Sequence, residues 1–186
     1  MLENRLENSG IRWPVSALGI LILLGLLGPI VIDLEQGLPL SLQSLLVCWL
    51  PLMLGWRAGV AGVLAYVAAG CFGLPVFAGY RGGMEILAGP TGGYLMGMPV
   101  AALVLGAMAS EHTEHLTDRK WYARIALGML VGHAIILSLG IPWQRQYDPE
   151  LDIPVLLNRL CGPVLLKSSI GLLLSVIVMR ATAPRA

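Results

Sequence analysis

Charged residues are scarce in this chain of 186 residues. Asp, Glu, Lys and Arg together make up 12% of it, about half the fraction that a soluble domain usually carries. The formal net charge is +1, which gives no electrostatic basis for binding a polyanion. We therefore expect no nucleic-acid partner.

Motifs for nucleotide binding and catalysis are also missing. No GxxxxGK[ST] sequence occurs, so ATP-driven work would have to come from another subunit. No serine lies in a GxSxG context. Cys48, Cys71 and Cys161 are widely spaced, without a CxxC, in apolar surroundings, which predicts buried small side chains. We expect neither enzymatic activity nor a cofactor.

Apolar sequence is abundant: 56% of the residues are hydrophobic and the mean hydropathy is +0.77. A membrane-spanning helix needs roughly 20 apolar residues, so the chain has room for five or six. We predict an all-α membrane protein, a single bundle of six transmembrane helices in one integral-membrane domain over residues 1–186. Residues 1–12 form a polar N-terminal segment, and residues 70–93 a glycine-rich outer loop. The predicted spans are 13–32, 41–54, 58–71, 92–109, 125–141 and 153–179.

The basic residues predict the orientation of this bundle. Cytoplasmic segments of membrane proteins carry an excess of Lys and Arg. With both termini inside, the inner segments hold eight of the twelve basic residues: Arg5, Arg12, Arg57, Arg119, Lys120, Arg124, Arg180 and Arg185. The prediction is an N-in, C-in topology with the glycine-rich loop outside.

Residues 70–97 interrupt the apolar pattern with many glycines and two prolines. Pro75 and Pro90 fix φ and remove donors, so the segment cannot be one continuous helix. Irregular backbone between membrane helices is tolerated where it is buried in protein or lines a wet cavity. This segment is the leading candidate for a binding site, and a glycine-rich surface turn is the alternative.

The glycine-rich motifs occur in a specific order: GLPVFAG at 73–79, GG at 82–83 and GPTGGY at 89–94. Upstream, LPLSLQ at 38–43 and WRAG at 56–59 fit the same pattern. Together they resemble the BioY family, the biotin-specific S components of energy-coupling-factor (ECF) transporters, well over residues 38–106 and weakly elsewhere.

The resemblance implies a substrate-binding subunit for high-affinity biotin capture and uptake in the plasma membrane of a prokaryote. The implied partners are biotin, membrane lipid, an ECF transmembrane coupling subunit and ABC-type ATPase subunits.

Lys167 is the sharpest single candidate residue, because it lies well inside the last predicted span. A lysine there costs about 2.5–3.5 kcal/mol on insertion scales, so it should face the bundle interior and be paired. Snorkelling to an interface is the alternative. In the BioY pattern, a lysine here looks like a ligand-binding residue. That pattern often has an acidic residue shortly before it, which this chain lacks, and Asn158 is the candidate substitute.

Other polar residues complete the predicted site. The guanidinium of Arg81 suits a carboxylate, so Lys167 or Arg81 would offset the carboxylate of biotin, although Arg81 could equally be solvated. Gln43 could serve an amide or ureido group, or be an ordinary helix-end residue. Tyr94 could supply a wall of the site or anchor at the membrane interface. The glycine-rich motifs add five candidates: Gly82, Gly83, Thr91, Gly92 and Gly93.

Two alternative functions remain at this point. One is an S component for another vitamin, which the missing acidic residue leaves open. The other is a small intramembrane metalloenzyme with Glu111, His112 and His115 as metal ligands. The HxxH spacing differs from HExxH, and these residues fall in a charged segment predicted to be a solvated cytoplasmic loop. His133 is alone in the fifth span and is interpreted as a packed polar residue.

Overall fold

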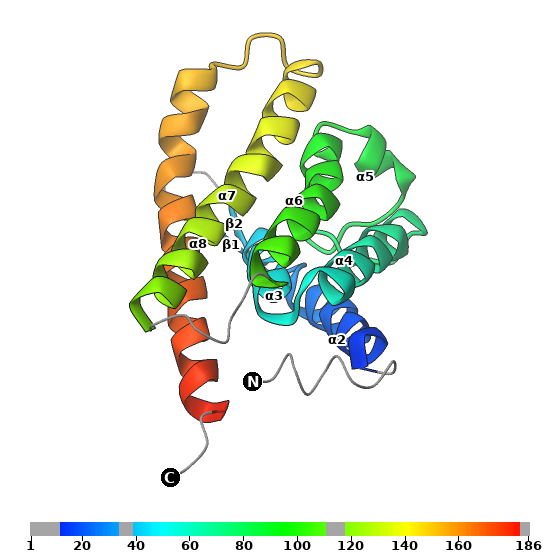
Figure 1. Ribbon diagram of the computed structural model, residues 1–186. Helices are drawn as coiled ribbons and strands as arrows, with labels where there is room; N and C mark the ends of the chain where they lie inside the picture. The colour runs from blue at the N-terminus through cyan, green and yellow to red at the C-terminus, as the bar shows by residue number, and fades with distance from the viewer. Residues whose placement is uncertain (1–11, 34–38, 111–117, 183–186) are drawn as a thin grey trace.

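The structure, a computed structural model, describes residues 12–33, 39–110 and 118–182. Within these residues the fold is all-helical apart from one two-stranded hairpin (Figure 1). The elements in chain order are α2 (Arg12–Leu27), β1 (Val31–Asp33), β2 (Pro39–Ser41), α3 (Leu42–Leu54), α4 (Trp56–Cys71), α5 (Met84–Ala88), α6 (Gly92–Ser110), α7 (Asp118–Arg145) and α8 (Ile153–Thr182).

The first helix ends earlier than its apolar run predicts. The run continues to residue 32, but α2 stops at Leu27. Pro29 disfavours helical geometry at the preceding residue and has no N–H to donate, so the helix cannot continue through it. Strand β1 follows and pairs antiparallel with β2, where Val31 is the partner of Ser41. Ser41 then caps α3 by accepting a hydrogen bond from the Gln43 N–H at 3.2 Å.

One further boundary and one additional helix correct the prediction. Helix α7 begins at Asp118, seven residues before the predicted start at 125, because the charged and aromatic residues there are compatible with a helix. The glycine-rich segment contains a short helix, α5, which was not predicted, whereas α6 begins at Gly92 as the predicted span 92–109 does. The irregular part of the segment is therefore shorter than predicted.

Helix α6 lies at the centre of the bundle and packs against α7, α3 and α4, while α2 packs on α4 and α8 on α7. Gly93 allows one of these close approaches. A Cβ at this position would lie 2.6 Å from the Leu139 carbonyl oxygen and would also overlap the Trp143 side chain. Glycine is therefore required where α6 crosses the end of α7.

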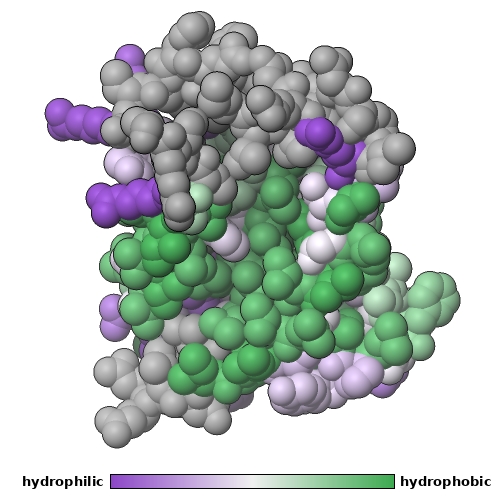
Figure 2. All heavy atoms as spheres, turned by 90° about the horizontal axis from the view of Figure 1, so that it is seen from below, coloured by the Kyte–Doolittle hydropathy of each residue, from purple (hydrophilic) through white to green (hydrophobic). Residues whose placement is uncertain are grey.

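Three of the described helices, α6, α7 and α8, are long and apolar enough to cross a membrane. The other three apolar helices, α2, α3 and α4, have 16, 13 and 16 residues. Figure 2 shows extensive apolar surface on the face it views. Large apolar side chains such as Leu26, Leu165 and Leu173 are more than half exposed, which is the expected surface of a protein surrounded by lipid.

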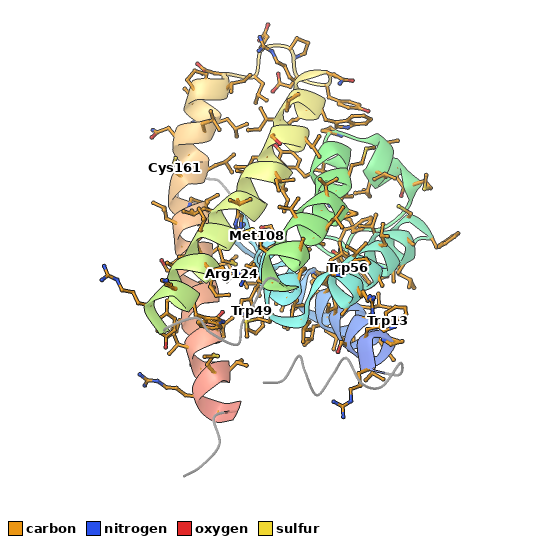
Figure 3. All side chains as sticks on the ribbon, in the orientation of Figure 1. Trp13, Trp49, Trp56, Met108, Arg124 and Cys161 are labelled. Carbon is orange, nitrogen blue, oxygen red and sulfur yellow. The ribbon has the colours of Figure 1, made fainter. Side chains whose placement is uncertain are left out.

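The glycine-rich segment and the α7–α8 connection meet at one end of the bundle. The indole N–H of Trp143 donates to the Gly89 carbonyl oxygen at 2.9 Å, and the Tyr147 hydroxyl donates to that of Ala88. Trp13, Trp56 and Arg124 lie toward the opposite end (Figure 3). The glycine-rich segment and the α7–α8 connection therefore lie on the same side of any membrane that the bundle crosses.

The cysteine prediction is confirmed at one position and wrong at another. Cys48 is buried in α3, whereas Cys71 is half-buried and Cys161 is exposed. Cys161 lies on α8, which projects from the edge of the bundle (Figure 3). Only 17% of the most apolar stretch of α8 is buried, against 56% for α6, so an apolar residue on α8 is not necessarily inside the protein.

Candidate functional site

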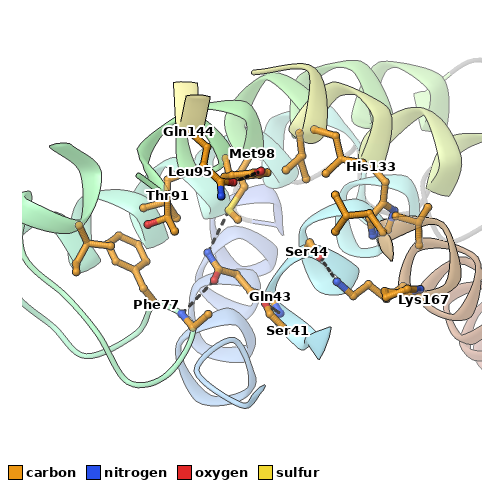
Figure 4. A pocket seen from close by; sticks show the side chains of 18 of the residues that line it. Ser41, Gln43, Ser44, Phe77, Thr91, Leu95, Met98, His133, Gln144 and Lys167 are labelled. Carbon is orange, nitrogen blue, oxygen red and sulfur yellow. Dashed lines mark hydrogen bonds between the residues drawn. The ribbon is translucent and has the colours of Figure 1, made fainter. Parts of the chain in front are cut away.

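A cavity of about 310 Å³ lies between the start of α3, the glycine-rich segment, α6, α7 and α8 (Figure 4). Its walls are mainly apolar side chains with a few polar groups, which is the usual make-up of a small-molecule site. The lining residues are Ser41, Gln43, Ser44, Phe77, Ala78, Arg81, Ile86, Thr91, Tyr94, Leu95, Met98, His133, Ile136, Leu137, Gln144, Leu156, Leu160, Pro163, Val164 and Lys167.

The two long C-terminal helices each present one face to this cavity. On α8 the lining positions are 156, 160, 163, 164 and 167, which recur at helical spacing. On α7 they are 133, 136, 137 and 144. The segments that form the cavity are far apart in sequence, so the site exists only when the bundle is assembled.

Lys167 is inside the protein, as its position in an apolar span predicts. It is 8% exposed, and its Nζ donates to the Ser44 hydroxyl oxygen at 2.9 Å (Figure 4). The cavity lining contains two cations, Arg81 and Lys167, and neither Asp nor Glu among the described residues. Burying a charge without a counter-ion costs free energy, so an anionic ligand would be favoured here.

Arg81 belongs to the loop-formed part of the lining and is exposed. Its backbone forms a bridge with Phe77, whose N–H donates to the Arg81 carbonyl oxygen at 2.9 Å. Its Nε donates to the Ala78 carbonyl oxygen at 3.0 Å. This bond fixes the start of the guanidinium group and leaves its two terminal nitrogens for a ligand.

Gln43 connects the glycine-rich segment to the helices. It is 3% exposed, its Oε1 accepts from the Ala78 N–H at 3.1 Å, and its Nε2 donates to the Met98 sulfur at 3.2 Å (Figure 4). The sequence suggests a ligand contact at Gln43. The structure places it in the lining and also gives it a role in anchoring the loop.

Tyr94 lines the cavity from α6, and its hydroxyl donates to Gln144 Oε1 of α7 at 2.7 Å. This bond ties the two helices together beside the cavity. Trp143 directly precedes Gln144 but lies outside the cavity lining. Its indole N–H donates to the Gly89 carbonyl oxygen.

The structure brings five of the ten predicted site residues into the cavity lining: Gln43, Arg81, Thr91, Tyr94 and Lys167. The other five are outside it: Gly82, Gly83, Gly92, Gly93 and Asn158.

The glycines outside the lining shape the backbone around the cavity. Gly83 has φ +109°, a conformation that side chains disfavour, and its N–H donates to the Gly70 carbonyl oxygen at 2.7 Å. Asn158 is exposed on α8. It precedes Lys167 by nine residues, which at about 100° per residue puts it on the opposite helix face. The structure therefore does not bring Asn158 into the cavity beside Lys167.

Four polar lining residues were not among the sequence candidates: Ser41, Ser44, His133 and Gln144. Ser44 directly follows Gln43, and His133 was interpreted as a packed polar residue. In the sequence, His133 stands out as a single polar residue within an apolar helix. That pattern predicts burial, but it does not distinguish a packed core from a cavity lining. The proposed metal ligands Glu111, His112 and His115 lie outside the described residues, and no cluster of potential metal ligands occurs within them.

Comparison with known proteins relates the chain to one family. The model of the BioY family matches residues 5–186. The biotin transporter BioY of Thermotoga maritima is 40% identical over 103 residues, 55% of this chain and 57% of that protein. The probable biotin transporter BioY of Pyrococcus horikoshii is 33% identical over 59% of this chain and 60% of that protein. The biotin transporter BioY of Rhodobacter capsulatus is 40% identical over 59% and 56%.

These matches span less than two thirds of the length of the relatives. The fold is also similar to a solved structure, the crystal structure of the S-component for biotin from an ECF-type ABC transporter. That similarity has a TM-score of 0.60 and 22% sequence identity, and it covers 88% of each chain. At this identity it supports the shared fold.

Proposed function

Because this chain belongs to the BioY family, we propose that it captures biotin as the substrate-binding S component of an ECF transporter. The chain is a multi-pass protein of the prokaryotic plasma membrane. Separate subunits, a transmembrane coupling protein and ABC-type ATPases, energise uptake. The whole chain acts as a single substrate-binding domain.

The observation that carries this proposal is the cavity with two cations and no carboxylate in its described lining. Biotin has an apolar bicyclic ring system with a urea edge and a flexible apolar chain that ends in a carboxylate. The apolar walls suit the rings and the chain, and Lys167 or Arg81 offsets the negative charge. Several curated relatives are named as biotin transporters, which supports biotin as the anionic ligand.

The test is equilibrium binding of labelled biotin to the purified protein in detergent. We expect saturable binding of one biotin, with other vitamins competing weakly. Mass spectrometry of small molecules that co-purify provides a second readout, because a tight ligand stays bound. A folded protein without saturable biotin binding, or with preference for another vitamin, would overturn the proposal.

We propose six spans with both termini in the cytoplasm. Helices α2, α3 and α4 are the short spans, and the glycine-rich segment and the α7–α8 connection lie outside. The support is the distribution of basic residues and the contacts that join these two segments. In a background without native cysteines, Arg81→Cys should react with a membrane-impermeant thiol reagent from outside and Asp118→Cys only from inside. Reversed labelling would refute the orientation.

A further inference from the structure

His133 has a buried hydrogen-bonding atom that nothing in the described residues satisfies. The side chain is 3% exposed and lines the cavity. Its Nδ1 lies 2.7 Å from the Met129 carbonyl oxygen, one helical turn earlier. Its Nε2 is buried and has no hydrogen-bond partner within the described residues. Buried polar atoms are nearly always paired, so an unpaired one on a residue that lines a cavity points to a ligand contact.

The chemistry of this ring follows from its one hydrogen bond. A carbonyl oxygen only accepts, so Nδ1 carries the hydrogen and donates to Met129. In the neutral ring Nε2 then holds a lone pair and can only accept. A further positive charge is unfavourable in this lining, which already contains Lys167 and Arg81 and has no carboxylate in its described part. His133 therefore offers an acceptor to the cavity.

Packing of α7 fixes where this acceptor lies. At Gly132 a Cβ would be 2.6 Å from Leu105 Cδ1 and 2.7 Å from Cys48 Sγ, so α7 contacts α6 and α3 directly beside His133. Figure 4 shows His133, Ser44 and Lys167 at one end of the cavity and Phe77 and Thr91 at the other. We call the first group, His133, Ser44 and Lys167, the helix end. It combines an acceptor with the ammonium donor of Lys167.

We infer that His133 is a specificity-determining residue whose Nε2 accepts a hydrogen bond from an N–H of the ligand. The inference rests on the proposed function, in which the ligand is biotin. The urea edge of biotin has N–H groups next to a carbonyl oxygen, so one edge satisfies His133 and Lys167 together. The carboxylate of biotin then lies toward Arg81.

A cycle of ligand and protein variants tests this contact. The ligands are biotin and its two monomethyl derivatives, each with one urea N–H replaced by N–CH₃. In the parent protein, methylation of the contacted nitrogen should weaken binding at least about 10-fold. His133→Leu should bind biotin about 10- to 100-fold more weakly, and its penalty for the same methyl group should largely disappear. His133→Gln, which keeps an acceptor oxygen, should recover part of the affinity.

Size-exclusion chromatography and thermal unfolding establish that the variants are folded, with Ala134→Leu on the exposed side of α7 as the matched control. The inference is overturned if folded His133→Leu binds biotin as tightly as the parent, or if both methyl penalties persist unchanged in it. A parent that binds no biotin overturns the proposed function and the inference with it. If the parent protein binds biotin but substitution of His133 changes neither the affinity nor the methyl penalties, only the inference is overturned.

Discussion

The two ends of the cavity hold their cations in different ways. At the helix end, Lys167 is 8% exposed, bonds to Ser44 and projects from α8. At the loop end, which consists of Phe77, Ala78 and Arg81, the arginine is exposed and is fixed by one bond to the adjacent backbone. A buried donor on a helix can enforce the identity of a ligand, whereas an exposed cation on a loop mainly attracts charge.

This contrast also explains which end depends more on glycine. The loop end contains a turn with Gly79 at φ +75° and leads to Gly83 at φ +109°, so its backbone shape depends on residues without side chains. The helix end depends on close helix packing, as at Gly132. The loop end can therefore be loosened without disturbing the bundle, and the helix end cannot.

The largest effect should come from Lys167→Met, which removes the buried donor but keeps a side chain of similar length. We expect biotin binding to weaken about 100-fold, because a hydrogen bond from a charged group contributes about 1.5–3 kcal/mol. Biotin and biotin amide should lose affinity equally if, as we infer, Lys167 contacts the urea edge. Isothermal titration calorimetry with both ligands measures this, and Leu165→Met on the exposed side of α8 is the control. If Lys167→Met weakened binding of biotin but not of biotin amide, the carboxylate would lie at the helix end.

A smaller effect is expected from Arg81→Met at the loop end. Biotin should bind about 10-fold more weakly and biotin amide about as before, because an exposed arginine acts through the ligand charge. Binding of biotin to the parent should also weaken with added salt, and this dependence should shrink in Arg81→Met. Titrations at two ionic strengths measure both quantities, and Arg145→Met, outside the cavity lining, is the control. A loss that is equal for the two ligands would contradict the assignment.

The smallest effect on affinity should come from Gln43→Leu, which removes the bond between Gln43 Oε1 and the Ala78 N–H. One neutral hydrogen bond contributes about 1 kcal/mol, so biotin should bind roughly 5-fold more weakly. The specific expectation is faster hydrogen exchange at Ala78 and its loop neighbours, with α7 and α8 unchanged. Exchange measured by mass spectrometry tests this, with exposed Gln146→Leu as the control. Unchanged exchange in the loop would show that Gln43 does not anchor it.

Much of the helical plan follows from local pattern. Apolar runs and breaker residues locate α3, α4, α6 and α8 to within two or three residues of their observed ends. The pattern failed at α2, where Pro29 stops the helix although the apolar residues continue, and at α7, whose charged first turns were interpreted as a loop. Hydropathy records the preference for lipid, but it does not record where backbone geometry ends a helix.

The site was predictable where the residue type was costly in its local environment. A lysine inside an apolar helix signals an interior position, and the structure places Lys167 there. Asn158 was a poorer choice, since helical spacing alone puts it opposite Lys167. His133 was interpreted as a packed polar residue and is buried, but its place in the cavity lining was not predicted, because a histidine in an apolar helix has the same sequence pattern in a packed core as beside a cavity.

The sequence by itself determined that this chain is a bundle of apolar helices interrupted by a glycine-rich segment, and its ordered motifs indicated the family. Hydrophobic length, proline positions and a buried lysine are local properties, so they can be read from the chain directly. Only the tertiary structure decided that Ser44, His133 and Lys167 share one end of a cavity and that Phe77, whose backbone forms a bridge with Arg81, lies at the other. These residues come from different elements, and their meeting depends on the rotation and close packing of α3, α7 and α8, which no local pattern specifies.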